Sequence, residues 1–301
     1  MSDSAKGFLA MVACCTIWGL SGLFFKVLED VPVLEVLAHR TFWSAVVFLI
    51  VLRIQRRMQA LRVALRPKSA LIIACAALFI TGNWFTYVWA IHNHHALEAS
   101  LGYYIFPLFS VVLGVVFLGE KLGWPQRLAV LLAALAVLYL GIGLGRAPFV
   151  PLTLGVTFGM YGLIKKGIKA DPLVSVTAEV LLLAPLSLGY MLALELGWAG
   201  TGGGHFGRDP TETLFLVLSA GLTAVPLMLF SYAAQRLKLS TVGLMQYMNP
   251  TLQLMVALFI FAEPLTPWHK VTLPVIWIAL ALYSYGSFGQ ARLARAAAAP
   301  K

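Results

Sequence analysis

The sequence predicts an all-α polytopic membrane protein with ten transmembrane helices, arranged as two inverted five-helix repeats. Three observations predict this fold class: the composition, the spacing of apolar segments and an internal repeat. The chain has 301 residues, of which 60% are hydrophobic and 11% are charged, and its mean hydropathy is +0.86. Soluble domains carry about 25% charged residues, because water must hydrate their surface. The composition therefore argues against a soluble enzyme, a disordered chain or a nucleic-acid-binding protein.

Ten apolar segments have about the length needed to cross a bilayer. A helix needs about 20 mostly apolar residues to span the hydrocarbon core. In chain order the expected spans are 7–27, 33–52, 69–91, 97–118, 127–144, 150–164, 173–194, 213–234, 241–262 and 271–290. The first exceeds the apolar region of a cleavable signal, so we expect it to be a permanent helix. The fifth and sixth are short, and the count depends most on them.

Short turns connect several of these spans. An acidic turn follows the first span, and Pro32 opens the second, as Pro172 opens the seventh. His92, His94 and His95 fall between the third and fourth spans. We interpret these histidines as a solvated turn, with a pH sensor and a metal site as less favoured alternatives. No metal ligand is assigned, because the three are crowded in sequence and have no thiolate partner.

The distribution of basic residues orients the chain, since cytoplasmic loops are enriched in Lys and Arg. With a cytoplasmic N-terminus, seventeen of the 22 basic residues lie on the cytoplasmic side. They are Lys6, Arg53, Arg56, Arg57, Arg62, Arg66, Lys68, Lys121, Arg127, Lys165, Lys166, Lys169, Arg236, Lys238, Arg292, Arg295 and Lys301. We therefore expect a multi-pass membrane protein with both termini in the cytoplasm. The net charge of +10 is attributed to this orientation and to contacts with anionic lipid, not to nucleic acid.

The two halves of the chain resemble each other in sequence. Residues 18–26 align with residues 158–166 at a constant offset of 140. Further along, two Pro and Glu pairs share a spacing of 13, namely Pro107 with Glu120 and Pro250 with Glu263. Several matches in the same order and at similar offsets are difficult to attribute to apolar composition alone. We therefore predict two repeats, residues 1–146 and residues 147–301.

An odd number of spans in each repeat makes the second repeat cross the membrane upside down relative to the first. Inverted repeats are common in secondary transporters, whose substrate site lies near the bilayer midplane between the halves. Proline within a span is tolerated where neighbouring helices or a wet cavity satisfy the freed backbone groups. We accordingly predict that the matched pair Pro107 and Pro250 acts as hinges.

A few ionisable side chains lie inside predicted spans, where a charge is costly and usually functional. Glu35 and His39 are four residues apart on one helix face, and Arg40 follows them. Glu179 is the repeat counterpart of His39, and Glu98 opens the fourth span. We predict that His39 and Arg40 contact the solute and that Glu35, Glu98 and Glu179 handle a coupling proton. The alternative is a structural ion pair that fixes helix packing.

Aromatic and amide side chains in the third, fourth and ninth spans are the candidates for the cavity wall. They are Asn83, Trp84, Tyr87, Tyr103, Tyr104, Gln246, Tyr247 and Asn249. Aromatic faces with a few amides and hydroxyls suit a neutral or zwitterionic, partly apolar solute. For the aromatics near the ends of spans, a place in the interfacial belt is the alternative.

Four stretches of the chain resemble the RarD-type branch of the EamA, or drug/metabolite transporter, superfamily. They are residues 35–44, 83–90, 98–105 and 246–251. The resemblance extends from Trp18 to Tyr285 and is specific as an ordered set. It implies a ten-helix inner-membrane permease built from two inverted EamA repeats. Members of this branch are often labelled as chloramphenicol-sensitivity proteins, which does not identify a physiological solute.

Together these patterns predict a secondary transporter, or permease, for a small organic solute such as an amino-acid-like compound, a related metabolite or a drug. No nucleotide-binding motif is present, so we expect alternating access without ATP or another cofactor. Proton coupling is an open part of this hypothesis. The alternatives are an intramembrane enzyme that uses the Glu35 and His39 cluster, and an uncoupled facilitator or channel.

Overall fold

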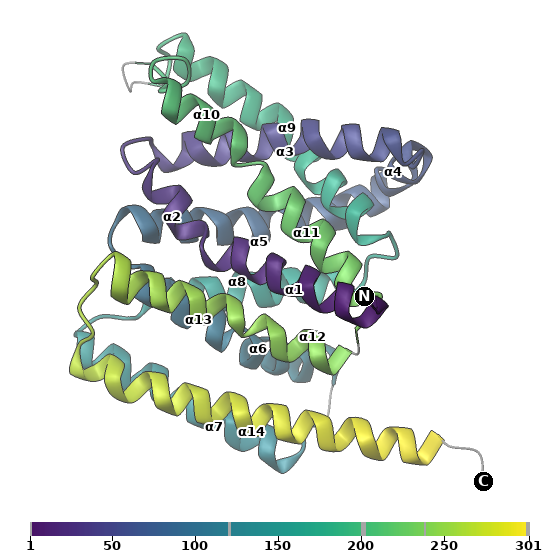
Figure 1. The fold of residues 1–301 in the computed structure, drawn as a ribbon, viewed down its shortest axis with the longest axis vertical. Helices are drawn as coiled ribbons and strands as arrows, with labels where there is room; N and C mark the ends of the chain where they lie inside the picture. Colours follow the sequence, from purple (N-terminus) through teal and green to yellow (C-terminus); the bar gives the residue numbers. More distant parts are fainter. Residues whose placement is uncertain (1, 120–121, 200–202, 238, 299–301) are drawn as a thin grey trace.

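The protein is described by a computed structural model that covers residues 2–119, 122–199, 203–237 and 239–298. Throughout these ranges it is built from helices and connecting turns, without strands (Figure 1). In chain order the helices are α1 (Asp3–Gly19), α2 (Ser21–Lys26), α3 (Val33–Ile54), α4 (Met58–Ala64), α5 (Pro67–His92), α6 (Ala96–Leu118), α7 (Trp124–Leu144), α8 (Phe149–Lys166), α9 (Pro172–Glu195), α10 (Pro210–Leu218), α11 (Gly221–Ala234), α12 (Leu239–Gln246), α13 (Met248–Met255), the π-helical turn η1 (Val256–Ile260) and α14 (Pro267–Ala298). Glu120, Lys121, Lys238 and Lys301, which the sequence predictions used, lie outside the described residues.

Seven helical segments are long and apolar enough to cross a membrane. They are Asp3–Lys26, Val33–Ile54, Pro67–His92, Ala96–Leu118, Trp124–Leu144, Pro172–Glu195 and Pro210–Ala234. Each coincides with one of the predicted spans, so the chain is a multi-pass, all-α membrane protein. The other three predicted spans are occupied by α8, by the stretch from α12 to η1, and by α14. The count of ten spans and the inverted arrangement stay predictions.

Proline and aspartate set the start of several helices. Pro172 and Pro210 stand at the first positions of α9 and α10, where a missing backbone N–H costs nothing. Asp209 caps α10, because its side chain accepts a hydrogen bond of 2.8 Å from the backbone N–H of Glu212. Pro107 lies inside the continuous helix α6, whereas Pro250 lies in the first turn of α13. The two predicted hinges therefore differ in local structure.

Three of the predicted spans are interrupted helices. The first breaks at Leu20, between α1 and α2, and the eighth breaks at Ser219 and Ala220, between α10 and α11. The ninth breaks at Tyr247, between α12 and α13. A break inside lipid is tolerated only where the freed backbone groups find partners within the protein. The interrupted helices therefore mark the parts of the chain that face other helices.

Helices from the two halves of the chain pack against each other. The pairs in closest contact are α6 with α8, α7 with α14, α3 with α9, α1 with α11 and α5 with α8. In Figure 1, α7 and α14 lie side by side along one edge, and α3 and α9 lie at the opposite edge. The main apolar core runs between these edges and includes the fully buried Phe25, Leu101 and Leu154.

Helices α1 and α13 approach closely because of one small residue. A Cβ atom on Gly19 would lie 2.6 Å from the Cβ atom of Leu252 and 3.2 Å from the carbonyl oxygen of Asn249. Both distances are shorter than normal van der Waals contact. Small residues at such crossings are typical of packed membrane helices, where close van der Waals contact drives association.

We predict that Gly19→Ala lowers the stability of the detergent-solubilised protein by about 1–3 kcal/mol, because the added methyl group must push α1 and α13 apart. The fall should be visible as a lower Tm. The matched control is Gly82→Ala in α5, where no atom lies within 4 Å of the new Cβ. That variant should be unchanged or more stable, by up to about 1 kcal/mol, because alanine is the better helix former. Equal effects of the two substitutions would contradict the close crossing.

Candidate functional site

Arg40 is the centre of a cluster where both halves of the chain meet. It lies in the first half of α3, and only 5% of its surface is exposed. Its Nε donates a hydrogen bond of 3.0 Å to the Oγ1 atom of Thr223 in α11. The guanidinium carbon lies 4.2 Å from the centre of the Trp84 ring and 5.6 Å from that of Phe25. Aromatic faces attract a cation, and the attraction is strongest where water is excluded.

Tyr87 and Tyr103 extend this cluster as a wall of aromatic rings. The centres of their rings are 5.8 Å apart, and Tyr87 packs edge-on against Phe25 at 6.1 Å. The Tyr87 hydroxyl is 3.1 Å from the Oγ atom of Ser21, which donates to the carbonyl of Trp18 at the break between α1 and α2. The interrupted first span thus contributes directly to this wall.

Asn83 joins three helices below the wall. Its Oδ1 atom accepts a hydrogen bond of 2.9 Å from the Tyr103 hydroxyl, in α6. Its Nδ2 atom donates to the carbonyl of Leu154 and to the hydroxyl of Thr157, both in α8 and both at 3.0 Å. The amide is 1% exposed. In this conformation Asn83 therefore positions Tyr103 and holds α5, α6 and α8 together.

Glu35 and His39 share a helix face, as predicted, but they bind other partners. The Oε1 atom of Glu35 accepts hydrogen bonds from the backbone N–H groups of His205 (2.6 Å) and Phe206 (3.3 Å). His39 accepts a hydrogen bond of 3.2 Å from the Trp43 indole and stacks on the Phe206 ring at 4.7 Å. The two side chains thus hold the loop between α9 and α10 against α3. They do not form the acid–base pair that an intramembrane enzyme needs.

Glu179 forms a separate ionic cluster between α8 and α9. Its Oε1 atom lies 2.7 Å from Nζ of Lys165 and accepts a hydrogen bond of 3.2 Å from Ser175. Its Oε2 atom accepts a hydrogen bond of 3.1 Å from the Tyr161 hydroxyl. Both carboxylate oxygens are therefore bonded. This geometry agrees with the alternative raised from the sequence, a structural ion pair that fixes helix packing.

Glu98 belongs to a third cluster, at the start of α6. Its Oε1 atom lies 2.7 Å from Nη2 of Arg146 and 3.1 Å from Nδ1 of His95. Next to it, the carboxylate of Glu263 accepts two hydrogen bonds of 2.7 Å from the backbone N–H groups of Ala96 and Leu97. The sequence analysis used Glu263 only as part of the repeated Pro and Glu spacing and did not predict this cap. Its paired spacing with Pro250 was the available signal.

The remaining candidates, Tyr104 of the first half and three residues of the second half, are more scattered. Tyr104 points to α13, where its hydroxyl lies 2.7 Å from the Oγ1 atom of Thr251. Asn249 accepts a hydrogen bond of 3.1 Å from Gln253, Tyr247 is half-buried and Gln246 is exposed. The structure therefore brings Arg40, Trp84, Tyr87, Tyr103 and Asn83 together, and it does not bring this second group to them. Among the described residues, no group of three or more His, Cys, Asp or Glu side chains could hold a metal ion.

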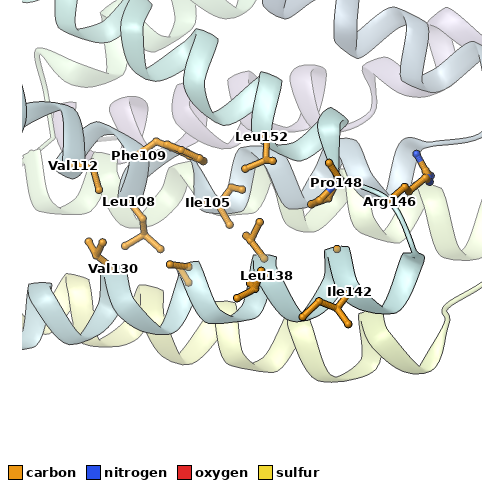
Figure 2. Close-up of a pocket in the computed structure, with 15 residues that line it drawn as sticks. Ile105, Leu108, Phe109, Val112, Val130, Leu138, Ile142, Arg146, Pro148 and Leu152 are labelled. Carbon is orange, nitrogen blue, oxygen red and sulfur yellow. The ribbon is translucent and has the colours of Figure 1, made fainter.

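An apolar groove of about 570 Å³ lies away from this cluster, between α6, α7 and the start of α8. Its walls are mostly aliphatic, including Leu108, Leu138 and Ile142, and Arg146 lies at one end (Figure 2). Leu138 and Ile142 are 59% and 70% exposed, so the groove opens on the outside of the helix bundle. In a membrane protein, such a surface faces lipid.

Comparisons with known proteins give a consistent result. The model of the EamA-like transporter family matches residues 5–142. Protein RarD of Escherichia coli (strain K12) is 38% identical over 93% of this chain and 94% of the relative. Uncharacterized transporter YojE of Bacillus subtilis (strain 168) is 39% identical over 94% of this chain and 95% of the relative. Chloramphenicol-sensitive protein RarD of Pseudomonas aeruginosa is 30% identical over 98% of both chains.

A solved structure described as "Crystal structure of protein" has the same fold. Its TM-score is 0.57 and its sequence identity is 19%, over 93% of this chain and 96% of that chain. At this identity the likeness concerns the fold alone.

The Glu179 cluster makes a prediction about stability. Lys165→Met should destabilise the protein by about 3–5 kcal/mol, because it leaves the Glu179 carboxylate buried without its cation. The double variant Lys165→Met with Glu179→Leu should recover most of that loss, since it removes both charges. Unfolding by denaturant in detergent measures both. The control, Lys6→Met, removes an exposed lysine that lies 3.9 Å from Asp3 and should change stability by less than about 0.5 kcal/mol. If the loss of stability in the double variant equals the sum of the losses in Lys165→Met and Glu179→Leu measured singly, the two side chains do not interact and the pairing is contradicted.

Proposed function

The chain belongs to the EamA-like transporter family, and from this premise we propose that it moves a small organic solute across the bacterial inner membrane by alternating access. The protein is a transporter and not an enzyme, since the family is one of transporters and several close relatives are named so. The proposed solute is an amino-acid-like compound, a related metabolite or a drug. We further propose ten spans, with both termini in the cytoplasm and with inverted halves at residues 1–146 and 147–301.

The observation that carries this proposal is the symmetry of helix packing. In the proposed repeats, the helices of the first half have counterparts in the second: α1 and α2 correspond to α8, α3 to α9, α5 to α10 and α11, α6 to the segment from α12 to η1, and α7 to α14. If the packing is symmetric, each contact between helices should have a matching contact between their counterparts. The contact of α1 with α11 matches that of α8 with α5, and both are present. The contact of α1 with α13 matches that of α8 with α6, and the contact of α5 with α9 matches those of α3 with α10 and α11; all of these are present. Such two-fold packing supports inverted repeats and a site between them.

The position of the Arg40 cluster supports the same proposal. Phe25, Arg40 and Trp84 come from the first half of the chain, and Thr223 comes from the second. Motion of one half against the other would therefore change the cluster. In other transporters, interrupted helices lie at such sites, and here the breaks at Leu20 and Ala220 lie close to Phe25 and Thr223 in the chain. Pro107 and Pro250 remain the proposed hinges.

Proton coupling is proposed to use Glu35 or Glu98, and not Glu179. In both Glu35 and Glu98 the Oε2 atom is buried without a hydrogen-bond partner among the described residues. Both oxygens of Glu179 are bonded, and it has a lysine partner. A carboxyl group with one unbonded oxygen can take up a proton without first breaking an ion pair at that oxygen. An uncoupled facilitator is the alternative form of the same function.

We predict saturable uptake of at least one compound when the purified protein in liposomes is offered labelled amino acids, aromatic metabolites and amphenicols. Asn83→Ala should slow that uptake by about tenfold or more, because Tyr103 loses the partner that positions it. Lys6→Met is the control and should transport normally. Uptake that stays proportional to concentration for every compound, at the rate of protein-free liposomes, would refute the proposed transport.

The same liposomes test coupling. If the cycle carries a proton, a gradient of one pH unit should change the accumulation ratio by up to about tenfold. Either Glu35→Gln or Glu98→Gln should abolish that response while uncoupled exchange continues, because the amide cannot be ionised, and the variant that does so identifies the coupling residue. If the accumulation ratio of the unmodified protein is the same with and without the pH gradient, the coupled mechanism is excluded and the facilitator is favoured.

A further inference from the structure

We infer that the transported solute carries a carboxylate group and that Arg40, assisted by Thr223, binds it. The inference deepens the proposed function and rests on it for the claim that the cluster is a transport site. It adds the chemical class of the solute. Arg40 carries a positive charge inside a predicted span, and the described part of the chain gives it no acidic partner.

Arg40 has no acidic partner in the part of the chain that the structure describes. Its one hydrogen bond within the protein uses Nε, whose acceptor is the neutral hydroxyl of Thr223. A guanidinium group has five N–H donors, and four of them are on the two Nη atoms. Arginine within a membrane usually pairs with an acid or with backbone carbonyl groups. Here it instead packs against the rings of Trp84 and Phe25.

The carboxylates in neighbouring clusters are already engaged elsewhere. Glu35 accepts hydrogen bonds from the loop backbone at His205 and Phe206. Glu98 pairs with Arg146, and Glu179 pairs with Lys165. These contacts account for the intramembrane acids that could otherwise have neutralised Arg40. A ligand with a negative charge would therefore complete the environment of Arg40.

The N–H groups on the two Nη atoms are the part of Arg40 that could bind an anion. The guanidinium carbon lies 4.2 Å from the centre of the Trp84 ring, and Thr223 accepts the Nε–H. Both Nη atoms remain without an acceptor in the described residues, and an arginine edge of this kind binds a carboxylate through two parallel hydrogen bonds. A lysine at this position would offer a point charge without the matching fork.

A second polar group lies at the same place. Thr223 is the third residue of α11. Its hydroxyl accepts from Arg40 and donates to no acceptor among the described residues, so it is available to a ligand. The backbone N–H groups of Leu222 and Thr223 are already bonded to the carbonyls of Ser219 and Ala220, so the start of the helix adds no free donor. The Arg40 guanidinium and the Thr223 hydroxyl together favour an anionic group.

The surrounding side chains define the rest of the solute. Phe25, Tyr87 and Tyr103 form an aromatic wall next to the guanidinium. Such a wall fits an apolar or aromatic body, and the unpaired positive charge repels cations. The expected class is a small carboxylate with an apolar body, either a simple organic acid or a zwitterionic amino acid.

Matched compounds test this class directly. Binding to the purified protein in nanodiscs is measured by the shift in Tm for 3-phenylpropionate, its amide and 3-phenylpropylamine, and for phenylalanine and its amide. The two carboxylates should bind about tenfold or more tightly than their amides, and the amine should not bind. Arg40→Met should remove the preference for carboxylate, and Arg40→Lys should restore part of it. Thr223→Val weakens carboxylate binding without removing the buried charge, so it tests the site even if Arg40→Met fails to fold.

The control variant is Arg236→Gln, since Arg236 also lies over an aromatic ring, that of Tyr232 at 3.6 Å, but outside this cluster. It should keep the full preference for carboxylates. The inference is overturned if the amides bind as tightly as the acids, if Arg40→Met keeps the preference, or if neither carboxylate binds. If neutral or cationic compounds are transported and carboxylates are not, the transport function stands and this inference fails. If the carboxylates bind but are not taken up by proteoliposomes, the assignment of Arg40 as a carboxylate-binding residue stands and the transport function fails.

Discussion

The absence of water from the bilayer core determines how this protein uses its few charges. A charged or polar group there must find its partner inside the protein, and the protein meets this need in three clusters. Glu179 pairs with Lys165, Glu98 pairs with Arg146, and Glu35 binds the backbone of a loop. Each cluster joins different segments of the chain, from the neighbouring helices α8 and α9 to residues 170 positions apart. The same requirement therefore satisfies the charges and fixes the packing of the helices.

Backbone groups follow the same rule as side chains. The first N–H groups of α6 have no partner in their own helix, and the Glu263 carboxylate from the other half accepts two of them. The break within the eighth predicted span, at Ser219 and Ala220, is fully buried among other helices, whereas Leu20 at the first break is 37% exposed. Tertiary contacts of this kind allow an interrupted helix to exist in a membrane. They also concentrate polar groups between the halves, where a solute would pass.

Arg40 is the exception, and its environment explains why it matters. Its partners are two aromatic rings and one hydroxyl, which support a cation only partly. The other buried charges stabilise one arrangement of helices by completing their pairs. A charge that is left incomplete is available to a ligand, which is why we propose Arg40 as the binding residue. Glu179, in contrast, has both oxygens bonded within the protein, although both residues lie inside predicted spans.

Much of the fold followed from the sequence, because membrane helices are determined locally. A run of apolar residues of sufficient length must become a helix in lipid, and composition and prolines reveal it. The family resemblance, carried by four short stretches, is confirmed by relatives that match nearly the full chain. The sequence also singled out Arg40, Asn83, Trp84 and Tyr87 as candidates to contact the solute, and the folded chain places them in one cluster.

The contacts between side chains of different helices and loops could not be predicted from the local sequence. Sequence placed Glu35 and His39 on one face, yet only the folded chain shows that both hold the loop around Phe206. It identified Glu179 as the repeat counterpart of His39, and only the structure shows that Glu179 pairs with Lys165. The sequence by itself determined which segments are helical and which charges lie within them, because apolar length and spacing are local properties. Only the tertiary structure decided which of these charges are paired and that Arg40 has no acidic partner among the described residues, because pairing depends on contacts between helices.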